Sequence, residues 1–336
     1  MKSYIYTNIL LLSLVSMPLF AAEDQISSTD WVTLTLENDI IAGDDGGYTN
    51  GLGISWAQGP FDTFSENNIP AWMNSLSKDL AIARAPGKRR AVSYNIAQGM
   101  FTPVDIEAKA LITNDRPYVG LLYWQGNLHA FDNKVSDKVS IMLGVVGPAS
   151  GADKSQEFVH ELTDSTDPQG WDNQIENEAV FRVSANRLWR LASLTTDSSS
   201  EFDVIGTTLA GVGTFRSDVG AGIGFRWGRG LTRSFPTASI LPGRDINPLA
   251  GGQQKDWYAF LNVFGRYVAN DVTLDGNNFE NSHGVGLKHA QGVVVVGAAI
   301  NWNRWGFIIS TAKGTDIFEG QVQGTEFGSM SVTYRH

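Results

Sequence analysis

The chain has 336 residues, with 25 Lys and Arg against 35 Asp and Glu, a formal net charge of −10 and no cysteine. The acidic balance excludes nucleic acid held by bulk charge, and the lack of cysteine excludes disulfides, thiolate metal sites and Cys nucleophiles. The mean hydropathy of −0.13, without a later apolar run of membrane-spanning length, excludes a helical membrane protein but not a β-barrel, because alternating strands average out.

The N-terminal segment has the pattern of a secretory signal. Lys2 is its only charge, an apolar stretch covers residues 9–20, and small residues follow. A transmembrane anchor, which is the alternative, needs roughly 20 apolar residues, whereas polar side chains precede this stretch directly. We therefore expect residues 1–22 to be a signal peptide. Residues 23–336 are then expected to form a single domain with 24 basic and 35 acidic residues, a net charge of −11.

Alternation with a period of two is the dominant pattern after residue 30. One apolar face, for example, consists of Val219, Ala221, Ile223, Phe225 and Trp227. A strand that separates two different solvents requires such alternation. A soluble β-sandwich shows it too, with shorter strands. Runs such as 117–131 and 176–190 favour tilted membrane strands.

We therefore expect an all-β fold, a transmembrane antiparallel β-barrel of about 12 strands with short helices in its loops. The strands are predicted near 31–37, 49–57, 90–100, 117–131, 135–147, 176–190, 202–213, 217–229, 255–269, 288–303, 305–314 and 326–335. An even number closes the sheet and places both termini on the periplasmic side. Short amphipathic helices are expected within 66–83 and 153–163. Tryptophans near strand ends would fit an interfacial girdle.

Strand parity places three polar loops on the outer rim of the barrel. They lie near 38–48, 102–116 and 148–175, and the third contains His160. The connections near 58–89 and 229–255 would then be periplasmic, where turns are usually short. A polar loop alone is weak support for a site, but three on one rim with a histidine make a site plausible.

Residue chemistry leaves the nature of that site open. Asp39 and Thr49 flank a glycine-rich acidic turn whose oxygens suit calcium. A solvated turn without a metal is the alternative, because the spacing is not that of an EF-hand. His160 suits a general base, although a lone loop histidine is often incidental. The chain has neither a Gly-x-Ser-x-Gly elbow nor a His-Glu-x-x-His zinc motif.

Several short motifs follow one another along the chain. They are Leu36-Glu37-Asn38-Asp39, Tyr48-Thr49-Asn50-Gly51-Leu52, Asn114-Asp115-Arg116-Pro117-Tyr118-Val119-Gly120, His160, and Gly170-Trp171-Asp172-Asn173-Gln174 continuing to Glu178. Taken in this order, they resemble the LpxR family of outer-membrane lipid A 3′-O-deacylases. The resemblance covers nearly the whole mature chain. It implies a twelve-stranded barrel and a calcium-dependent hydrolase that removes the 3′-acyloxyacyl chain of lipid A in the outer leaflet.

The resemblance also implies roles for individual residues. His160 would be the catalytic histidine that activates water, with Asn38 orienting the site or donating to the oxyanion. Ca²⁺ would be held by Asp39 and by oxygens around Thr49, and would stabilise the oxyanion. Lys109 matches the functional lysine of the family after a shift of one residue, and would bind a lipid phosphate.

The family's glutamate a few residues after the histidine has no clean equivalent. Glu161, Asp164 and Asp167 are the candidates, and Asp164 is assigned to the metal. The implied partners are lipid A, or lipopolysaccharide, and the outer membrane itself. No nucleic acid and no protein partner is implied. An esterase or phospholipase acting on another lipid, and a porin-like barrel with inert loops, remain as alternatives.

Overall fold

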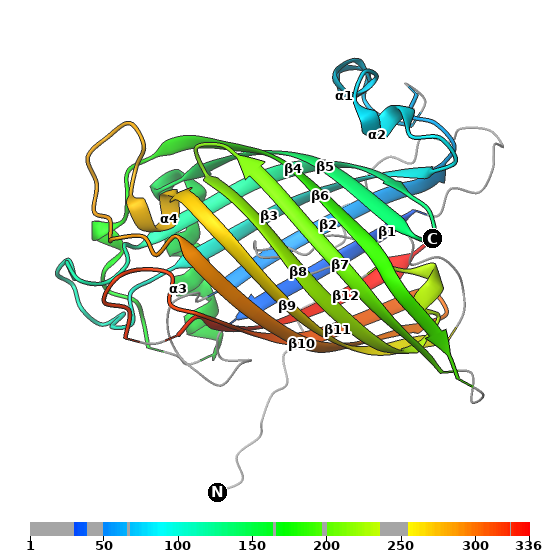
Figure 1. The fold of residues 1–336 in the computed structure, drawn as a ribbon. Helices are drawn as coiled ribbons and strands as arrows, with labels where there is room; N and C mark the ends of the chain where they lie inside the picture. The colour runs from blue at the N-terminus through cyan, green and yellow to red at the C-terminus, as the bar shows by residue number, and fades with distance from the viewer. Residues whose placement is uncertain are drawn as a thin grey trace, which may run out of the picture.

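A computed structural model describes residues 30–38, 50–65, 68–163, 166–196, 200–235, 255–322 and 324–336. The expected signal peptide, residues 1–22, lies outside the described residues. Within them, twelve antiparallel strands form a closed barrel in which each strand pairs with its neighbours in sequence and β1 pairs with β12 (Figure 1). The prediction of a barrel of about 12 strands is confirmed.

The strand bounds agree with the predicted ranges within a few residues. The strands are β1 (Trp31–Asn38), β2 (Asn50–Phe61), β3 (Arg89–Phe101), β4 (Val119–Phe131), β5 (Val135–Val146), β6 (Glu178–Thr195), β7 (Glu201–Val212), β8 (Arg216–Arg229), β9 (Asp256–Asp271), β10 (Ala290–Trp302), β11 (Trp305–Gly314) and β12 (Glu326–Arg335). The β1–β12 register runs from Trp31 opposite Arg335 to Asn38 opposite Gly328. Because this seam is fully paired, the first and last strands present no free edge.

The two faces of the wall meet different surroundings. On β1, Leu34 and Leu36 point outward and are 53% and 43% exposed. Thr35 between them points into the lumen, where it shares a 2.9 Å hydrogen bond with Ser331 of β12. The apolar outer face and polar inner face are what a barrel in a bilayer requires.

Six tryptophans mark one rim of the barrel. They lie near strand ends at the rim that also holds Asp30 and His336, and they are Trp56, Trp189, Trp227, Trp257, Trp302 and Trp305. Indole rings prefer the boundary between hydrocarbon and water. We call this end the termini rim and the opposite end the loop rim.

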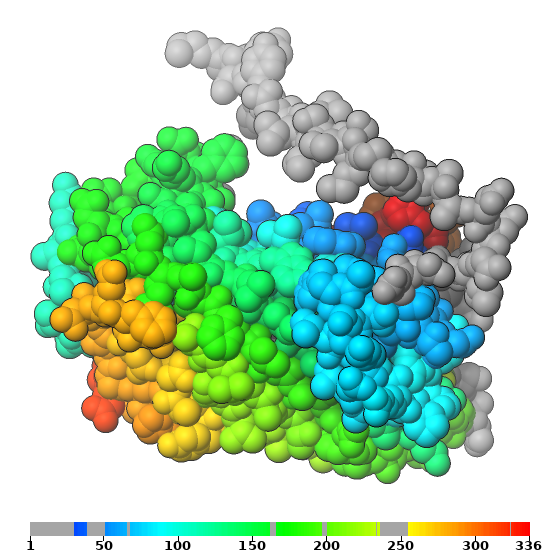
Figure 2. Space-filling model, turned by 90° about the horizontal axis from the view of Figure 1, so that it is seen from above, coloured from blue at the N-terminus to red at the C-terminus, as the bar shows by residue number. Residues whose placement is uncertain are grey.

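The connection from β2 to β3 lies at the termini rim and folds back onto the barrel. It contains α1 (Ala71–Ser77) and α2 (Ala81–Arg84). The short helix expected within 66–83 is therefore present as α1, but it ends before Lys78, and a second short helix starts after Leu80. In α1, Met73 is buried in a cluster with Val92 and Leu128 of the barrel wall. Figure 2 shows this segment as a cyan mass against the side of the barrel.

Among the described residues, the connections at the loop rim carry two further α-helices and two 3-10 helices, while η4 (Leu231–Arg233) follows β8 at the termini rim. The β5–β6 connection holds η2 (Pro148–Ser150), α3 (Ala152–Thr163) and η3 (Trp171–Asn173), and the β9–β10 connection holds α4 (Val272–Asp275). The helix expected at 153–163 is confirmed as α3. No helix in the described part of the chain is long and apolar enough to cross a membrane. The loops predicted near 102–116 and 148–175 lie at the loop rim (Figure 1). β1 ends and β2 begins at the same rim, and residues 39–49 between them lie outside the described residues.

Candidate active site

The connections at the loop rim are joined by hydrogen bonds into one layer. The Gln169 amide donates to the Ile106 carbonyl at 2.7 Å, which ties the β5–β6 connection to the β3–β4 connection. The side-chain amide of Asn173 donates to the Lys109 carbonyl at 2.8 Å. Lys109 is therefore held beside the connection that carries His160, while its side chain is exposed.

Helix α3 packs on the outside of the barrel wall. On β4, Val119 and Leu121 belong to the lumenal apolar cluster, so Gly120 between them faces outward. A Cβ atom at Gly120 would lie 2.6 Å from the Cβ of Ala152, the first residue of α3. The outward amide of Gln98 on β3 donates to the Ser150 carbonyl at 2.7 Å. The start of α3 therefore rests directly on the outer surface of β3 and β4.

His160 lies on the face of α3 that packs against the wall. Ala152 and Gln156 are buried, and His160 follows Gln156 by one turn on the same face. The Nδ1 atom of its ring lies 2.5 Å from the Thr166 carbonyl. A carbonyl only accepts, so Nδ1 carries the proton in this contact, and in the neutral ring Nε2 carries the lone pair.

The position of α3 is supported by an aromatic pair of which Tyr118 is buried. The Trp171 indole donates to Gln156 Oε1 at 2.8 Å, and its ring centroid lies 5.0 Å from that of Tyr118. Burial raises the pKa of the Tyr118 phenol to about 12, so the hydroxyl keeps its proton and donates to the Ile106 carbonyl at 3.2 Å. Sequence reasoning did not assign Gln156 a role, because its partner lies 15 residues away across a loop.

Asn38 ends β1 on the outer side of the wall. Glu37 is 1% exposed and points into the lumen, so Asn38 falls on the opposite face. It pairs with Asn50, the first residue of β2. Two strand spacings, about 10 Å, separate β1 from β3, the strand against which α3 packs. Asn38 and His160 therefore lie on the same outer surface at the loop rim.

The expected metal ligands Asp39, Thr49 and Asp164 lie outside the described residues. In the part of the chain that the structure describes, no three His, Asp or Glu side chains are close enough to hold a metal ion. The pairing of Asn38 with Asn50 fixes both ends of the segment that contains Asp39 and Thr49. Carboxylate and hydroxyl oxygens at these positions have the donor chemistry that Ca²⁺ prefers, so the calcium assignment stays a prediction.

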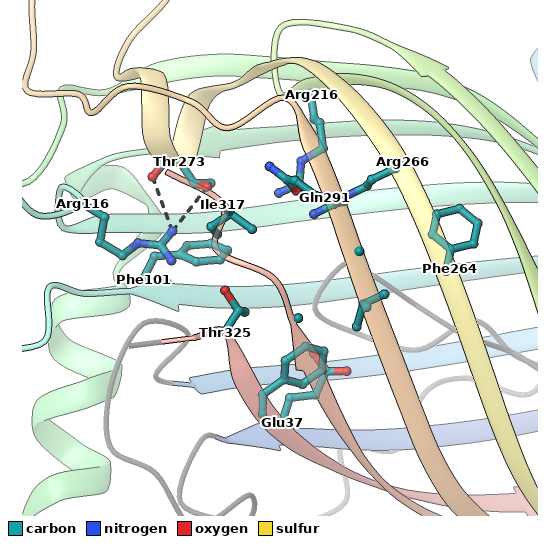
Figure 3. A pocket seen from close by; sticks show the side chains of 14 residues that line it. Glu37, Phe101, Arg116, Arg216, Phe264, Arg266, Thr273, Gln291, Ile317 and Thr325 are labelled. Carbon is teal, nitrogen blue, oxygen red and sulfur yellow. Dashed lines mark hydrogen bonds between the residues drawn. The ribbon is translucent and has the colours of Figure 1, made fainter. Parts of the chain in front are cut away.

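A cavity of about 80 Å³ lies inside the barrel below the same loops (Figure 3). It is lined by arginines from different elements, which include Arg116, Arg216 and Arg266. The Arg116 guanidinium lies 4.8 Å from the centre of the Phe101 ring, and its burial lowers the pKa to about 10. At neutral pH this side chain is therefore still charged.

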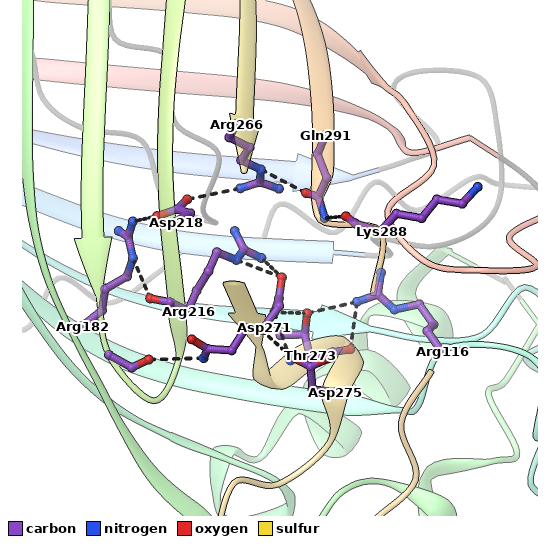
Figure 4. Close-up of polar contacts among 12 residues, drawn as sticks. Arg116, Arg182, Arg216, Asp218, Arg266, Asp271, Thr273, Asp275, Lys288 and Gln291 are labelled. Atoms are coloured by element: carbon purple, nitrogen blue, oxygen red, sulfur yellow. Dashed lines mark hydrogen bonds and ion pairs between the residues drawn. The ribbon is translucent and has the colours of Figure 1, made fainter. Parts of the chain in front are cut away.

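Hydrogen bonds from the lumenal arginines hold the loops at the loop rim in place (Figure 4). Arg216 of β8 donates to Asp271 of β9 at 2.8 Å. Asp271 in turn accepts from the Thr273 amide at 3.1 Å and so caps α4. Arg116 reaches the Thr273 carbonyl from the β3–β4 connection at 3.4 Å. This network lies on the lumenal side of the wall, so we assign it to support of the loops and not to chemistry on a lipid.

Comparison with known proteins decides the family. The family model described as "Outer membrane protein LpxR" matches residues 9–336. The chain belongs to the LpxR family. A search of curated protein sequences gave no match.

A solved structure of an LpxR protein has the same fold as this chain. LpxR from Salmonella typhimurium superposes with a TM-score of 0.74 at 17% identity, covering 90% of this chain and 99% of that one. The beta domain of the Bordetella autotransporter BrkA gives a TM-score of 0.45 at 10% identity, covering 92% and 98%. LpxR family membership and the barrel place the protein in the bacterial outer membrane, and they support the lipid A deacylase activity that the sequence motifs indicate.

Proposed function

We propose that this LpxR family member is a calcium-dependent lipid A 3′-O-deacylase that removes the 3′-acyloxyacyl chain in the outer leaflet. The observation that carries the proposal is the place of His160, on the wall-facing side of α3 and on the outside of the barrel at the loop rim. A lipid of the surrounding leaflet reaches this surface directly. A water-soluble substrate in the lumen does not.

His160 supplies the general base in this proposal. With the Nδ1 proton directed at the Thr166 carbonyl, Nε2 accepts a proton from water while the water oxygen attacks the ester carbonyl carbon. The tetrahedral intermediate then loses the ester oxygen of the sugar, which receives the proton from Nε2. The products are the free acyloxyacyl acid and a 3′-hydroxyl group on the glucosamine.

Asn38 and the predicted ligands would stabilise the developing charge. The amide of Asn38 donates to the oxyanion from the end of β1. Asp39, Thr49 and Asp164 would hold the calcium ion, which supplies a positive charge beside the ester carbonyl when bound. A general base contributes about 10²–10⁴-fold to such a rate, and a positioned oxyanion donor contributes about 10²–10³-fold.

Lys109 would contact a phosphate group of lipid A. Its carbonyl is fixed by Asn173 at 2.8 Å, and its ammonium is exposed at the rim where the phosphorylated glucosamine lies. A single charge-assisted contact of this kind contributes mainly to substrate binding. It would select phosphorylated lipid A over uncharged esters.

The test is mass spectrometry of lipid A incubated with purified protein. We expect loss of the 3′-linked acyloxyacyl group with calcium, and no loss with a chelator or with His160→Ala. Unchanged lipid A in the presence of calcium refutes the deacylase, and release of fatty acid from phospholipids alone would identify an esterase for another lipid. A chelator-resistant reaction refutes the calcium requirement while leaving the deacylase intact.

A further inference from the structure

A second feature of the outer wall lies away from His160, towards the termini rim. It is an open groove of about 760 Å³ that extends over β5, β6, β7 and β8 beside α2. Its floor consists largely of small outward side chains, which are Ala185, Thr208, Ala210 and Ala221. The register aligns Val139, Ala185, Ala210 and Val219 in one row across the four strands. Small side chains between larger neighbours make a furrow in the lipid-facing surface.

A charged group closes the groove on the side of the termini rim. Asp137 of β5 binds Lys88 at 2.7 Å and Arg187 of β6 at 2.5 Å. Asp137 lies directly opposite Arg187, two residues along β5 from Val139 towards the termini rim. The Arg187 guanidinium also lies 5.9 Å from the centre of the Trp189 ring. Together, Asp137, Lys88 and Arg187 carry one net positive charge, and they lie at the boundary of the membrane.

Arg187 has donors left for an anion. Its Nε is the atom that binds Asp137, and its side chain is 52% exposed. The two terminal amino groups of a guanidinium match a phosphate. Lys88 contributes a second cation on the far side of the same carboxylate, and only 12% of its side chain is exposed.

Helix α2 forms the side wall of the groove and belongs to a lipid-facing unit. Ile82 of α2 lines the groove and is 5% exposed because it packs on the barrel. On α1, Trp72 and Leu76 are 46% and 64% exposed. These apolar side chains extend the apolar outer surface of the strands at the termini rim. The segment that contains α1 and α2 therefore lies in the membrane interface.

We infer that this groove binds one glycerophospholipid of the periplasmic leaflet. Its phosphate accepts from Arg187 and Lys88, and an ethanolamine headgroup donates its ammonium protons to Asp137. One acyl chain lies along the furrow of Ala185 and Ala210. A phospholipid fits because the groove is continuous with the lipid-contacting wall and has a phosphate-binding group at the headgroup level and an apolar floor towards the bilayer centre.

The experiment measures phospholipid that stays with the barrel. Wild-type protein is extracted from outer membranes in a mild detergent, and bound lipid is identified by native mass spectrometry and quantified per barrel. Arg187→Gln removes the phosphate contact, which is worth about tenfold in affinity, and Ala210→Leu fills the furrow. Ala298→Leu on the lipid-facing side of β10, away from the groove, is the matched control.

We expect the wild type and Ala298→Leu to retain one phospholipid, and both groove variants to retain about tenfold less. The folded barrel of each variant is checked by its heat-modifiable mobility on gels. Wild-type retention by either groove variant overturns the inference, as does equal loss by Ala298→Leu. Bound lipopolysaccharide or a bound peptide in place of phospholipid overturns it as well.

Discussion

Gly120 offers the sharpest test of how α3 is positioned. In Gly120→Ala, the new Cβ would meet Ser150 Oγ and lie 2.6 Å from the Cβ of Ala152, whereas ordinary contact begins at 3.4 Å. The start of α3 must therefore move by about 0.8 Å, and His160 moves with it. A misplacement of about 1 Å costs on the order of 10²-fold in rate, which is about 2.7 kcal/mol of transition-state stabilisation.

Gly126→Ala is a matched control on the same strand. Gly126 also faces outward, and its new Cβ would lie 2.8 Å from the Trp124 ring and 3.1 Å from Met73 Cε. The crowding is similar, but it falls against α1 and not against α3. Acyl release from lipid A, followed by mass spectrometry over time, should slow about 10²-fold in Gly120→Ala and hardly change in Gly126→Ala. A folded Gly120→Ala barrel with the wild-type rate would refute the reasoning.

Four further outcomes follow from the site and its supports. His160→Ala should lower kcat about 10²–10⁴-fold while the barrel keeps its heat-modifiable mobility; an active variant removes the general base from the mechanism. Lys109→Ala should raise KM for lipid A more than it lowers kcat, and an unchanged KM in steady-state assays contradicts the phosphate contact. Arg116→Met should destabilise the fold by about 1–2 kcal/mol, because it removes the contacts to Thr273 and Phe101, which thermal unfolding measures. Burial raises the pKa of Asp275, so the folded state holds this proton more tightly than the unfolded state. The resulting stability is fully present below the unfolded pKa and is lost as pH rises through the raised one. Asp275→Asn should accordingly flatten the pH dependence of unfolding, and identical profiles contradict this.

The strands were predictable because alternation is a local property. Each run of outward apolar and inward polar residues shows its period without reference to any other segment. The terminal strand was predicted at 326–335, and β12 (Glu326–Arg335) has the same bounds. The number of strands then assigned each loop to a rim, since every strand reverses the direction of the chain.

The position of α3 was not predictable from local pattern. Its packing depends on Gln98 and Ser150, which are 52 residues apart, and on a glycine that permits the close approach. The helix expected within 66–83 shows the same limit, because its apolar spacing continues through the break after Lys78. The lumenal arginines were also missed, since pairs such as Arg216 with Asp271 depend on the register between β8 and β9.

The side of the wall on which α3 packs has a consequence for how substrate is met. A site on the outer surface of a barrel is reached by lateral diffusion within one leaflet, so the relevant substrate concentration is a density per unit area. The turnover rate then depends on how tightly the neighbouring lipids are packed. It also depends on how fast the released acid diffuses away from the site within the leaflet. Detergent micelles dilute such a substrate in two dimensions, and rates measured in them should fall as the mole fraction of lipid A falls, even at constant bulk concentration.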